Sequence, residues 1–389
     1  MALPTDPPLH AVPVLRRPFG RGRQVSAFTL GTMRALESFE AMEAVLVAAV
    51  ASGINHLETA PAYGPAEVFL GRALRRLQEH DPAGRAGLVL TSKLLPGPDV
   101  AEGRAQLLEC LSRLGVERLD NLAVHGLNRP EHLRWALAGP GADLLAWAVG
   151  EGLVGQVGFS SHGDTALIGS AVESGRFGFC SLHLHLFDQE RLPLARSALA
   201  AGLGVMAISP ADKGGRLQAP PAELEADCAP FAPLELAYRF LLAEGISTLT
   251  LGAARPEDLA WAVRLGDAAG PLSPAERQAL ARLEHAGRER LGAERCGQCR
   301  RCLPCPNTVP IPALLRLRNL AVGHGMEPYA QERYNLIGRA GHWWEQVDAS
   351  ACGRCGDCLP RCPLQLPIPD LLADTHRRLA AAPRRRLWG

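Results

Sequence analysis

Short apolar runs alternate with longer amphipathic stretches from about Val25 to Ala254. Each stretch after a run has the spacing of a helix, most clearly at residues 38–51, where Ser38 is a good N-cap. Residues 130–151 are expected to form a single helix of this kind. The apolar runs have the length of buried strands and cover residues 25–30, 54–57, 88–91, 121–124, 156–159, 181–186, 205–208 and 248–251. We therefore expect eight strand–helix units in this part of the chain.

Eight such units over roughly 240 residues have the number and length of a (β/α)8 barrel. An open, doubly wound sheet would also alternate strands with helices, but it commonly has a glycine-rich G-x-G-x-x-G turn after its first strand. Here the first strand runs into LGTMRALES, starting at Leu30, which has no such turn. The pattern therefore favours an α/β fold built on a TIM barrel.

The end of the chain has a different composition, because it holds eight of the eleven cysteines. The first run is C-x2-C-x2-C-x2-C-P and the second is C-x2-C-x2-C-x3-C-P. Each run is followed by the sequence P-I-P and a leucine-rich helical stretch, which indicates a weak internal duplication. The cysteines are Cys296, Cys299, Cys302 and Cys305 in the first run and Cys352, Cys355, Cys358 and Cys362 in the second.

Three closely spaced thiolates fit three irons of one cubane, and in two-cluster ferredoxins the fourth cysteine of such a run ligates the other cluster. We therefore predict two [4Fe–4S] clusters. One takes the first three cysteines of the first run with Cys362, and the other takes the first three of the second run with Cys305. Structural zinc is the alternative, but such sites usually use two C-x2-C knuckles a dozen or more residues apart.

Composition and charge narrow the class of protein. The net charge is +1 and the hydrophobic fraction is 47%, which predict a globular protein with neither nucleic acid nor membrane as a partner. No apolar run is long enough for a membrane span, and the proline-rich start does not fit a signal peptide. We expect a cytoplasmic protein, where clustered cysteines indicate metal or redox chemistry rather than disulfides.

Four polar residues fall at the ends of predicted barrel strands, where TIM barrels place their catalytic groups. Glu58 and Tyr63 follow the second strand, Lys93 ends the third and His125 ends the fourth. A phenol is a weak acid, with an ordinary pKa of about 10. A neighbouring ammonium favours the phenolate, a carboxylate keeps the ammonium charged, and a histidine can orient a carbonyl. These residue types predict an acid catalyst.

The segments ETAPAYGPAEVFLGRAL, TSK, LDNLAVHG, GQVGFSSH and ISTLTLGAARPEDL together resemble the aldo-keto reductase family, over roughly residues 15–290. The cysteine-bearing tail resembles the subgroup with a ferredoxin-like iron–sulfur region. The resemblance implies a reductase barrel over residues 15–292 and a mainly α-helical domain with two clusters over residues 293–389. It also implies that Tyr63 protonates the carbonyl, Lys93 tunes it and His125 binds the same oxygen. The fourth member is normally aspartate, and here it is Glu58.

The same resemblance implies a nicotinamide cofactor, NADPH or NADH, bound at the later strand ends. The chain departs from the family pattern there: Ser161 replaces an asparagine, His183 a glutamine and Ile208 an aromatic residue. Arg255 is the candidate for the 2′-phosphate, since a guanidinium binds phosphate oxygens in pairs. The residues implied to bind the cofactor are Ser160, Ser161, His183, Ser209, Gly252, Ala253 and Arg255.

Two functions follow from these patterns. The first is an NAD(P)H-dependent reductase of a small-molecule aldehyde or ketone that also carries two clusters. The second is an electron-transfer or redox-sensing protein whose barrel has lost efficient carbonyl reduction, acting with a redox partner protein. Hydride carries two electrons whereas each cluster accepts one, so direct coupling needs a converter such as a flavin, and no flavin fingerprint is visible in the sequence.

Overall fold

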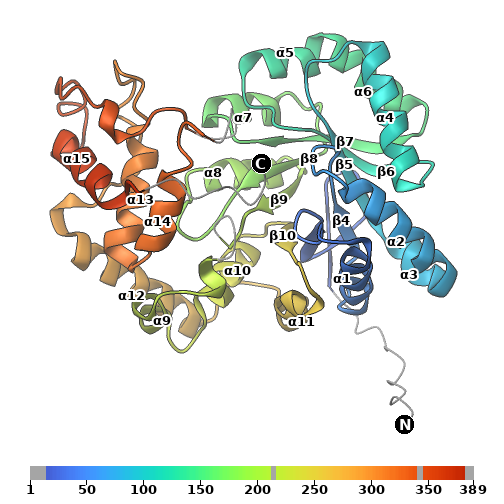
Figure 1. Ribbon diagram of the computed structural model, residues 1–389, viewed down its shortest axis with the longest axis horizontal. Coiled ribbons are helices and arrows are strands. Elements are labelled where there is room, and N and C mark those ends of the chain that lie inside the picture. Colours follow the sequence, from blue (N-terminus) through green and yellow to red (C-terminus); the bar gives the residue numbers. More distant parts are fainter. Residues whose placement is uncertain (1–14, 212–215, 340–344, 382–389) are drawn as a thin grey trace. The chain divides into compact units, whose positions relative to one another are not determined.

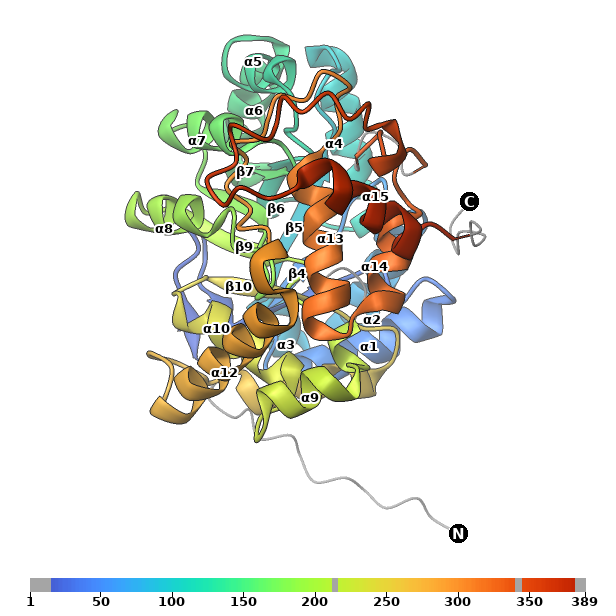
Figure 2. The same ribbon diagram turned by 90° about the vertical axis from the view of Figure 1, so that its left-hand side faces the viewer.

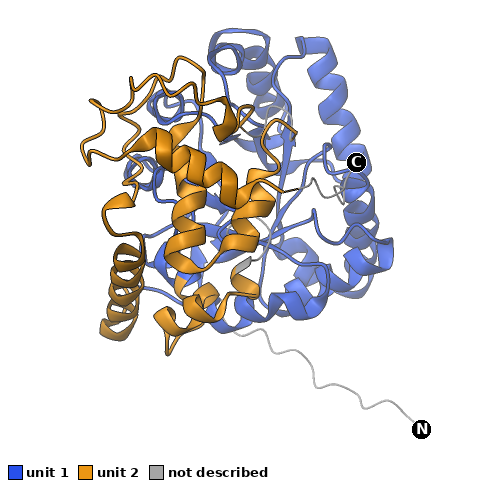
Figure 3. Ribbon diagram, turned by 60° about the vertical axis from the view of Figure 1, so that its left-hand side comes forward, with its two compact units in different colours: residues 1–210, 237–271 blue, residues 211–236, 272–389 orange. Residues whose placement is uncertain are grey.

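The computed structural model describes residues 15–211, 216–339 and 345–381. The chain divides into two compact units, coloured separately in Figure 3. Unit 1 comprises residues 1–210 and 237–271, and unit 2 comprises residues 211–236 and 272–389. The 18-residue helix from Pro274 to Leu291 thus belongs to the unit with the cysteines. The boundary between the reductase domain and the cluster domain, expected near residue 292, stays a prediction.

Unit 1 contains a closed barrel of eight parallel strands (Figure 1). Around the barrel the strands follow one another in chain order, and the last pairs with the first. The eight strands are β3 (Phe28–Gly31), β4 (His56–Glu58), β5 (Val89–Leu94), β6 (Leu119–Val124), β7 (Val154–Ser161), β8 (Phe179–His183), β9 (Gly204–Ile208) and β10 (Thr248–Gly252). The predicted TIM barrel is confirmed.

Helices follow the strands, as the periodicity predicts. They are α1 (Phe39–Ala51), α2 (Ala66–His80), α3 (Pro82–Gly87), α4 (Val100–Leu114), α5 (Pro130–Ala138), α6 (Pro140–Gly150), α7 (Thr165–Glu173), α8 (Leu192–Ala200), α10 (Pro233–Ala243), the 3-10 turn η2 (Pro256–Leu259) and α11 (Ala260–Leu265). The Ser38 side chain caps α1 by accepting a hydrogen bond from the Ala41 amide. The single helix expected over residues 130–151 is two, because Gly139 ends α5 and Pro140 starts α6.

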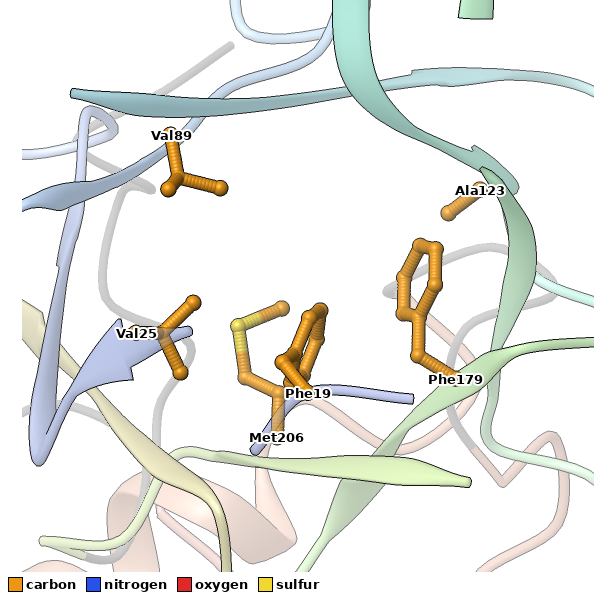
Figure 4. Packing of buried hydrophobic residues seen from close by; sticks show 6 residues of the cluster. All are labelled: Phe19, Val25, Val89, Ala123, Phe179 and Met206. Carbon is orange, nitrogen blue, oxygen red and sulfur yellow. The ribbon is translucent and has the colours of Figure 1, made fainter. Parts of the chain in front are cut away.

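A short hairpin covers the amino-terminal end of the barrel. Its strands are β1 (Arg16–Arg17) and β2 (Val25–Ser26), which pair antiparallel. Phe19, between them, is fully buried, and its ring centroid lies 5.0 Å from that of Phe179. Figure 4 shows Phe19 within a cluster of apolar side chains from the hairpin and four barrel strands. The barrel is therefore filled at this end.

Above this floor, buried polar side chains form a hydrogen-bonded chain across neighbouring strands. His56 Nε2 lies 2.7 Å from Thr91 Oγ1, and its Nδ1 lies 2.7 Å from Thr29 Oγ1. Asn121 Nδ2 donates to Thr91 Oγ1 at 2.9 Å, and Gln156 Nε2 donates to Asn121 Oδ1 at 2.8 Å. These hydrogen bonds satisfy polar side chains that would otherwise be costly to bury.

Unit 2 is helical in its described part, where no strand is formed. Its helices are α9 (Ala222–Cys228), α12 (Pro274–Leu291), α13 (Ile311–His324), α14 (Glu327–Tyr334) and α15 (Ile368–Leu379), with the 3-10 turns η1 (Arg216–Gln218), η3 (Gly292–Glu294) and η5 (Ala349–Ala351). Helices α13, α14 and α15 pack on one another (Figure 2). The buried Arg318 joins two of them through Asp374 of α15, at 2.8 Å.

The weak duplication of the sequence is a duplication of backbone conformation. Gln298 and Arg354, each two residues after the first cysteine of its run, have φ angles of 60° and 53°. Thr308 and Gln365, each three residues after the last cysteine, have φ angles of 54° and 52°. Such angles are uncommon outside glycine. Their repetition shows that both runs fold into the same loop.

None of the helices in the described ranges is long and apolar enough to cross a membrane.

Candidate active site and cysteine loops

The parallel register of the barrel brings the predicted catalytic residues to one rim. Glu58 ends β4 and is level with Gly31 of β3, which in turn is level with Gly252 of β10. Lys93 lies near the end of β5, level with Ala123 of β6. The carboxyl ends of the strands therefore bring these polar side chains to the carboxyl-terminal face of the barrel.

Tyr63, Lys93 and Glu58 are in direct contact. Lys93 Nζ donates a hydrogen bond to the Tyr63 hydroxyl at 2.8 Å and another to the Thr59 carbonyl at 3.1 Å. Lys93 also forms an ion pair with Glu58 Oε1. Lys93 and Glu58 are almost fully buried, at 2% and 4% exposure, whereas Tyr63 is half-buried. The phenol is thus the member of this group closest to solvent.

Burial sets the ionisation of this group. It raises the pKa of Tyr63, so the phenol stays protonated and able to donate at neutral pH. It lowers the pKa of Lys93 well below its ordinary value, because a buried ammonium loses its hydration. The carboxylate of Glu58 opposes this effect, since an opposite charge in contact favours the ammonium. The state of Lys93 therefore depends on Glu58.

The longer side chain at position 58 makes a second contact. The Tyr63 hydroxyl donates to Glu58 Oε1 at 3.3 Å, so one carboxylate oxygen meets both Lys93 and Tyr63. The proton of Tyr63 is then directed at a carboxylate within the protein.

His125 lies immediately after β6, and its ring meets that of Tyr63 edge to face, with centroids 5.8 Å apart. The next residue, Gly126, donates its amide to Ser160 Oγ at 3.0 Å. Ser160 thus has its hydroxyl hydrogen left to donate to a ligand. This contact links the catalytic side of the rim to the strand ends expected to bind the cofactor.

Ser161 is used within the protein. Its hydroxyl donates to the Leu127 carbonyl at 2.6 Å and accepts from the Gly163 amide at 3.0 Å, and the residue is fully buried. His183 ends β8, and its ring centroid lies 4.5 Å from that of His162. The Ser161 hydroxyl is therefore engaged within the protein, whereas the His183 ring lies against that of His162 at the end of its strand.

The remaining cofactor candidates lie after β9 and at the end of β10. Ser209 directly follows β9 with a φ angle of 57°, a strained conformation that is common at functional sites. The Asp258 carboxylate accepts hydrogen bonds from the amides of Ala254 and Arg255 at 2.8 and 3.2 Å. The Arg255 side chain is 76% exposed, so its guanidinium is open to a phosphate. Gly252 is exposed, whereas Ala253 is fully buried.

The eight cysteines of unit 2 repeat one pattern of exposure. In each run the second cysteine is exposed, the third is buried, and the first and fourth are intermediate. A mostly enclosed cavity is lined by Cys305 of the first run together with Cys352, Cys355 and Cys358 of the second. These are the four residues that the sequence groups into one cluster.

Hydrogen bonds between the two loops hold the fourth cysteine of each run beside the other run. The Arg361 guanidinium, next to Cys362, donates to the Pro304 carbonyl at 3.0 Å. The Asn307 amide, two residues after Cys305, donates to the Ala351 carbonyl at 2.8 Å. On the other half, Cys296 lies in electrostatic range of Cys362 as well as of Cys299. Each fourth cysteine thus faces the opposite run.

The described residues contain no group of three or more His, Cys, Asp or Glu side chains arranged to hold one metal ion. A cubane makes a different demand, because each thiolate binds its own iron. Both loops contain left-handed residues, and backbone turns of this kind form amide-lined concavities at many iron–sulfur sites. The cysteine loops therefore fit the chemistry of a cluster.

Two contacts at the site were not predicted from the sequence. The Thr59 carbonyl accepts a hydrogen bond from Lys93, and the His162 ring packs at a tilt against that of His183. A backbone carbonyl leaves no signal in a sequence. His162 could have been found, because it directly follows the β7 segment GFSS at a strand end.

Comparison with known proteins identifies the class. The model of the aldo/keto reductase family matches residues 27–282, more than half of the chain. The chain therefore belongs to the aldo/keto reductase family and is an NAD(P)H-dependent oxidoreductase.

Solved structures agree on the fold. An aldo-keto reductase from Bacillus halodurans, in its holo form, superposes with a TM-score of 0.59 at 19% identity, covering 69% of this chain and 95% of that one. A Bombyx mori aldo-keto reductase in complex with NADP superposes with a TM-score of 0.56 at 21% identity, covering 69% of this chain and 92% of that one.

Proposed function

We propose that the barrel reduces an aldehyde or ketone carbonyl of a small molecule, with Tyr63 as the general acid. The observation that carries this proposal is the 2.8 Å hydrogen bond between Lys93 Nζ and the half-buried Tyr63 hydroxyl. An acid of this kind must be protonated at neutral pH and must be stabilised after its proton has left. Burial meets the first demand, and Lys93, held charged by Glu58, meets the second.

When bound, reduced nicotinamide supplies a hydride to the carbonyl carbon. Tyr63 gives its hydroxyl proton to the carbonyl oxygen, so the C=O double bond becomes an alcohol. The resulting phenolate is stabilised by Lys93 Nζ and regains its proton from water. His125, edge-on to the Tyr63 ring, lies where it can hold the same carbonyl oxygen in line with the phenol.

Several residues of the rim fit the cofactor, for which we favour NADPH. Ser160 retains a hydroxyl hydrogen for the carboxamide, and His183 stands at the end of the next strand, β8. The exposed guanidinium of Arg255 suits a 2′-phosphate, because it forms paired hydrogen bonds with phosphate oxygens. The Bombyx mori relative was solved with NADP, which supports the same choice.

The test is the variant Tyr63→Phe, which removes only the hydroxyl. We expect kcat for simple aldehydes to fall by about 10²- to 10⁴-fold, the usual contribution of a general acid. NADPH binding, followed by nucleotide fluorescence, should be unchanged. Turnover at the wild-type rate in Tyr63→Phe would rule out the proposed role.

We further propose that unit 2 holds two [4Fe–4S] clusters, one on Cys296, Cys299, Cys302 and Cys362, the other on Cys352, Cys355, Cys358 and Cys305. The four-cysteine cavity and the hydrogen bonds between the loops support this partition. The clusters would supply one-electron chemistry. Reduced thiols suit the cytoplasm, which is the proposed location. Protein isolated without oxygen should contain about eight irons and eight sulfides per chain.

A second candidate function is electron transfer or redox sensing through unit 2, with a redox partner protein. The contact from Tyr63 to Glu58 favours it, because the carboxylate competes with substrate for the proton. The internal use of Ser161 favours it as well. An anaerobic titration with NADPH separates the candidates: a reductase binds the nucleotide while the cluster absorbance holds, whereas bleaching reveals an electron path to the clusters.

A further inference from the structure

A cavity of about 780 Å³ opens at the amino-terminal end of the barrel, opposite the catalytic rim. Its walls come from the β1–β2 hairpin, from α3 and from the segments that lead into β5, β6 and β7. This volume is within the range of about 300–1,000 Å³ that is usual for small-molecule sites. Its charged lining residues are Arg21, Arg23, Arg85, Arg118, Glu117 and Asp120.

Positive charge exceeds negative charge in this lining, whereas the whole chain is nearly neutral. Asp120 is already engaged: its Oδ2 accepts from the Leu90 amide at 2.8 Å and its Oδ1 lies 3.6 Å from Arg23. Arg23 also donates to the Leu88 carbonyl at 2.7 Å. These two charges therefore largely compensate each other.

Among the described residues, no carboxylate lies at ion-pair distance from the other three arginines, Arg21, Arg85 and Arg118. Within the described ranges, the Arg85 and Arg118 side chains donate no hydrogen bond to the protein, and Arg21 has a single contact of 3.4 Å with the Gly175 carbonyl. Arg85 is half-buried. Burial lowers its pKa; Asp120 opposes this effect and the charge of Arg23 adds to it. A half-buried guanidinium without a partner is costly, and an anion would remove that cost.

The backbone makes room for this arrangement. Gly155 of β7 lines the cavity, and a Cβ there would lie 3.2 Å from Arg118 Nη2 and 2.7 Å from the Asp120 carbonyl oxygen. A side chain at residue 155 would clash with the Asp120 carbonyl and crowd the Arg118 guanidinium.

We propose that this cavity binds a small organic polyanion, whose phosphate or paired carboxylate groups are held by Arg85 and Arg118, with Arg21 at the entrance. Guanidinium forks suit both groups, because each offers two oxygens in one plane. The site is separate from the nucleotide site, since its residues lie at the opposite ends of the strands. Binding would stabilise the folded barrel, because the ligand would interact with the folded state alone.

The test uses the full, cluster-loaded chain with pyrophosphate, inorganic phosphate and citrate as probes. Affinity is measured by calorimetry and by the shift in melting temperature at constant ionic strength. We expect one site per chain for pyrophosphate, citrate or both, and binding at least tenfold weaker in Arg85→Gln/Arg118→Gln. Preference for pyrophosphate would identify a phosphorylated ligand, and preference for citrate a polycarboxylate.

Two control variants locate the binding. Arg196→Gln removes an exposed arginine that pairs with Glu244 elsewhere on unit 1, and it should leave the affinity unchanged. Arg255→Gln alters the candidate nucleotide site and should also leave it unchanged. The proposal is overturned if the double variant binds as tightly as wild type, if only Arg255→Gln loses binding, or if sodium chloride reproduces the thermal shift.

Discussion

Glu58 supports the charged form of the lysine beside Tyr63, the proposed general acid. Lys93 is buried and its pKa is lowered, so its ammonium form relies on the adjacent carboxylate. The extra methylene of glutamate keeps that ion pair and adds the contact with the Tyr63 hydroxyl. One side chain thus supports the acid through Lys93 and competes with substrate for its proton.

Glu58→Gln removes the charge but keeps the length. Without the carboxylate the pKa of Lys93 falls further, and the ammonium is lost as pH rises through that lower value. We expect the alkaline limb of kcat/KM for carbonyl reduction to move to lower pH in this variant. Steady-state rates from pH 6 to 10 measure the shift.

The control is Glu58→Asp, which keeps the charge and withdraws the carboxylate from Tyr63. Its alkaline limb should stay close to that of the wild type. If the alkaline limb of kcat/KM lay at the same pH in wild type and Glu58→Gln, Lys93 would not be the group whose deprotonation causes it.

At the scale of the elements, the strands are joined inside the barrel by the polar chain around His56. Asn121 donates to Thr91, so the Thr91 hydrogen is free to point at His56 Nε2, and the opposite nitrogen can donate to Thr29. This arrangement of donors and acceptors gives each nitrogen of a neutral imidazole a hydrogen-bond partner. Burial, with the charge of Lys93 adding to it, lowers the pKa of His56 to about 3.

Above about pH 6.5, the ordinary pKa of histidine in an unfolded chain, His56 is neutral in both the folded and the unfolded state. As the pH falls towards 3, the unfolded chain binds a proton at His56 and the folded barrel does not, so the folded state loses stability. Between pH 6.5 and 4.5 the loss should be about 2 kcal/mol. We expect the free energy of unfolding to fall by that much more in wild type than in His56→Gln. Urea unfolding of unit 1 at both pH values provides the measurement.

The exposed His285 of α12 is the matched control, because His285→Gln leaves the barrel untouched. It should show the wild-type dependence on pH. If the free energy of unfolding fell equally in wild type and His56→Gln, the barrel would tolerate a charged imidazole at residue 56.

At the scale of the whole molecule, the proposed clusters bring together cysteines that are up to 66 residues apart in the sequence. Cys305 lines a cavity with three cysteines of the second run, and Cys362 is near enough to Cys296 to help raise its pKa. Each proposed cluster therefore ties both loops together. Loss of either cluster should loosen both loops at once.

Pairs of substitutions test this arrangement. If the fourth cysteines are exchanged, Cys305→Ser and Cys352→Ser damage the same cluster, and the double variant keeps about four irons per chain. Cys305→Ser with Cys296→Ser damages both clusters and should leave almost none. The opposite result, with iron lost in the first pair and retained in the second, would show that each run binds its own cluster.

Strand and helix positions could be read from the sequence because local periodicity encodes them. All eight predicted barrel strands are present, and Ser38 caps its helix. Helix α3 was missed, since its six residues PAGRAG carry no apolar face. The break at Gly139 was also missed, because an amphipathic pattern can continue across two helices.

By itself, the sequence determined the barrel, the residue types at its strand ends and the two cysteine motifs, because each depends on spacing along the chain. Tertiary structure decided which of these groups have a free hydrogen-bonding capacity. It engages Ser161 with backbone groups, brings Glu58 to Tyr63 and gathers arginines around a cavity at the far end of the barrel. Such contacts join residues that are far apart in the sequence, and they produce no periodic pattern from which they could be predicted.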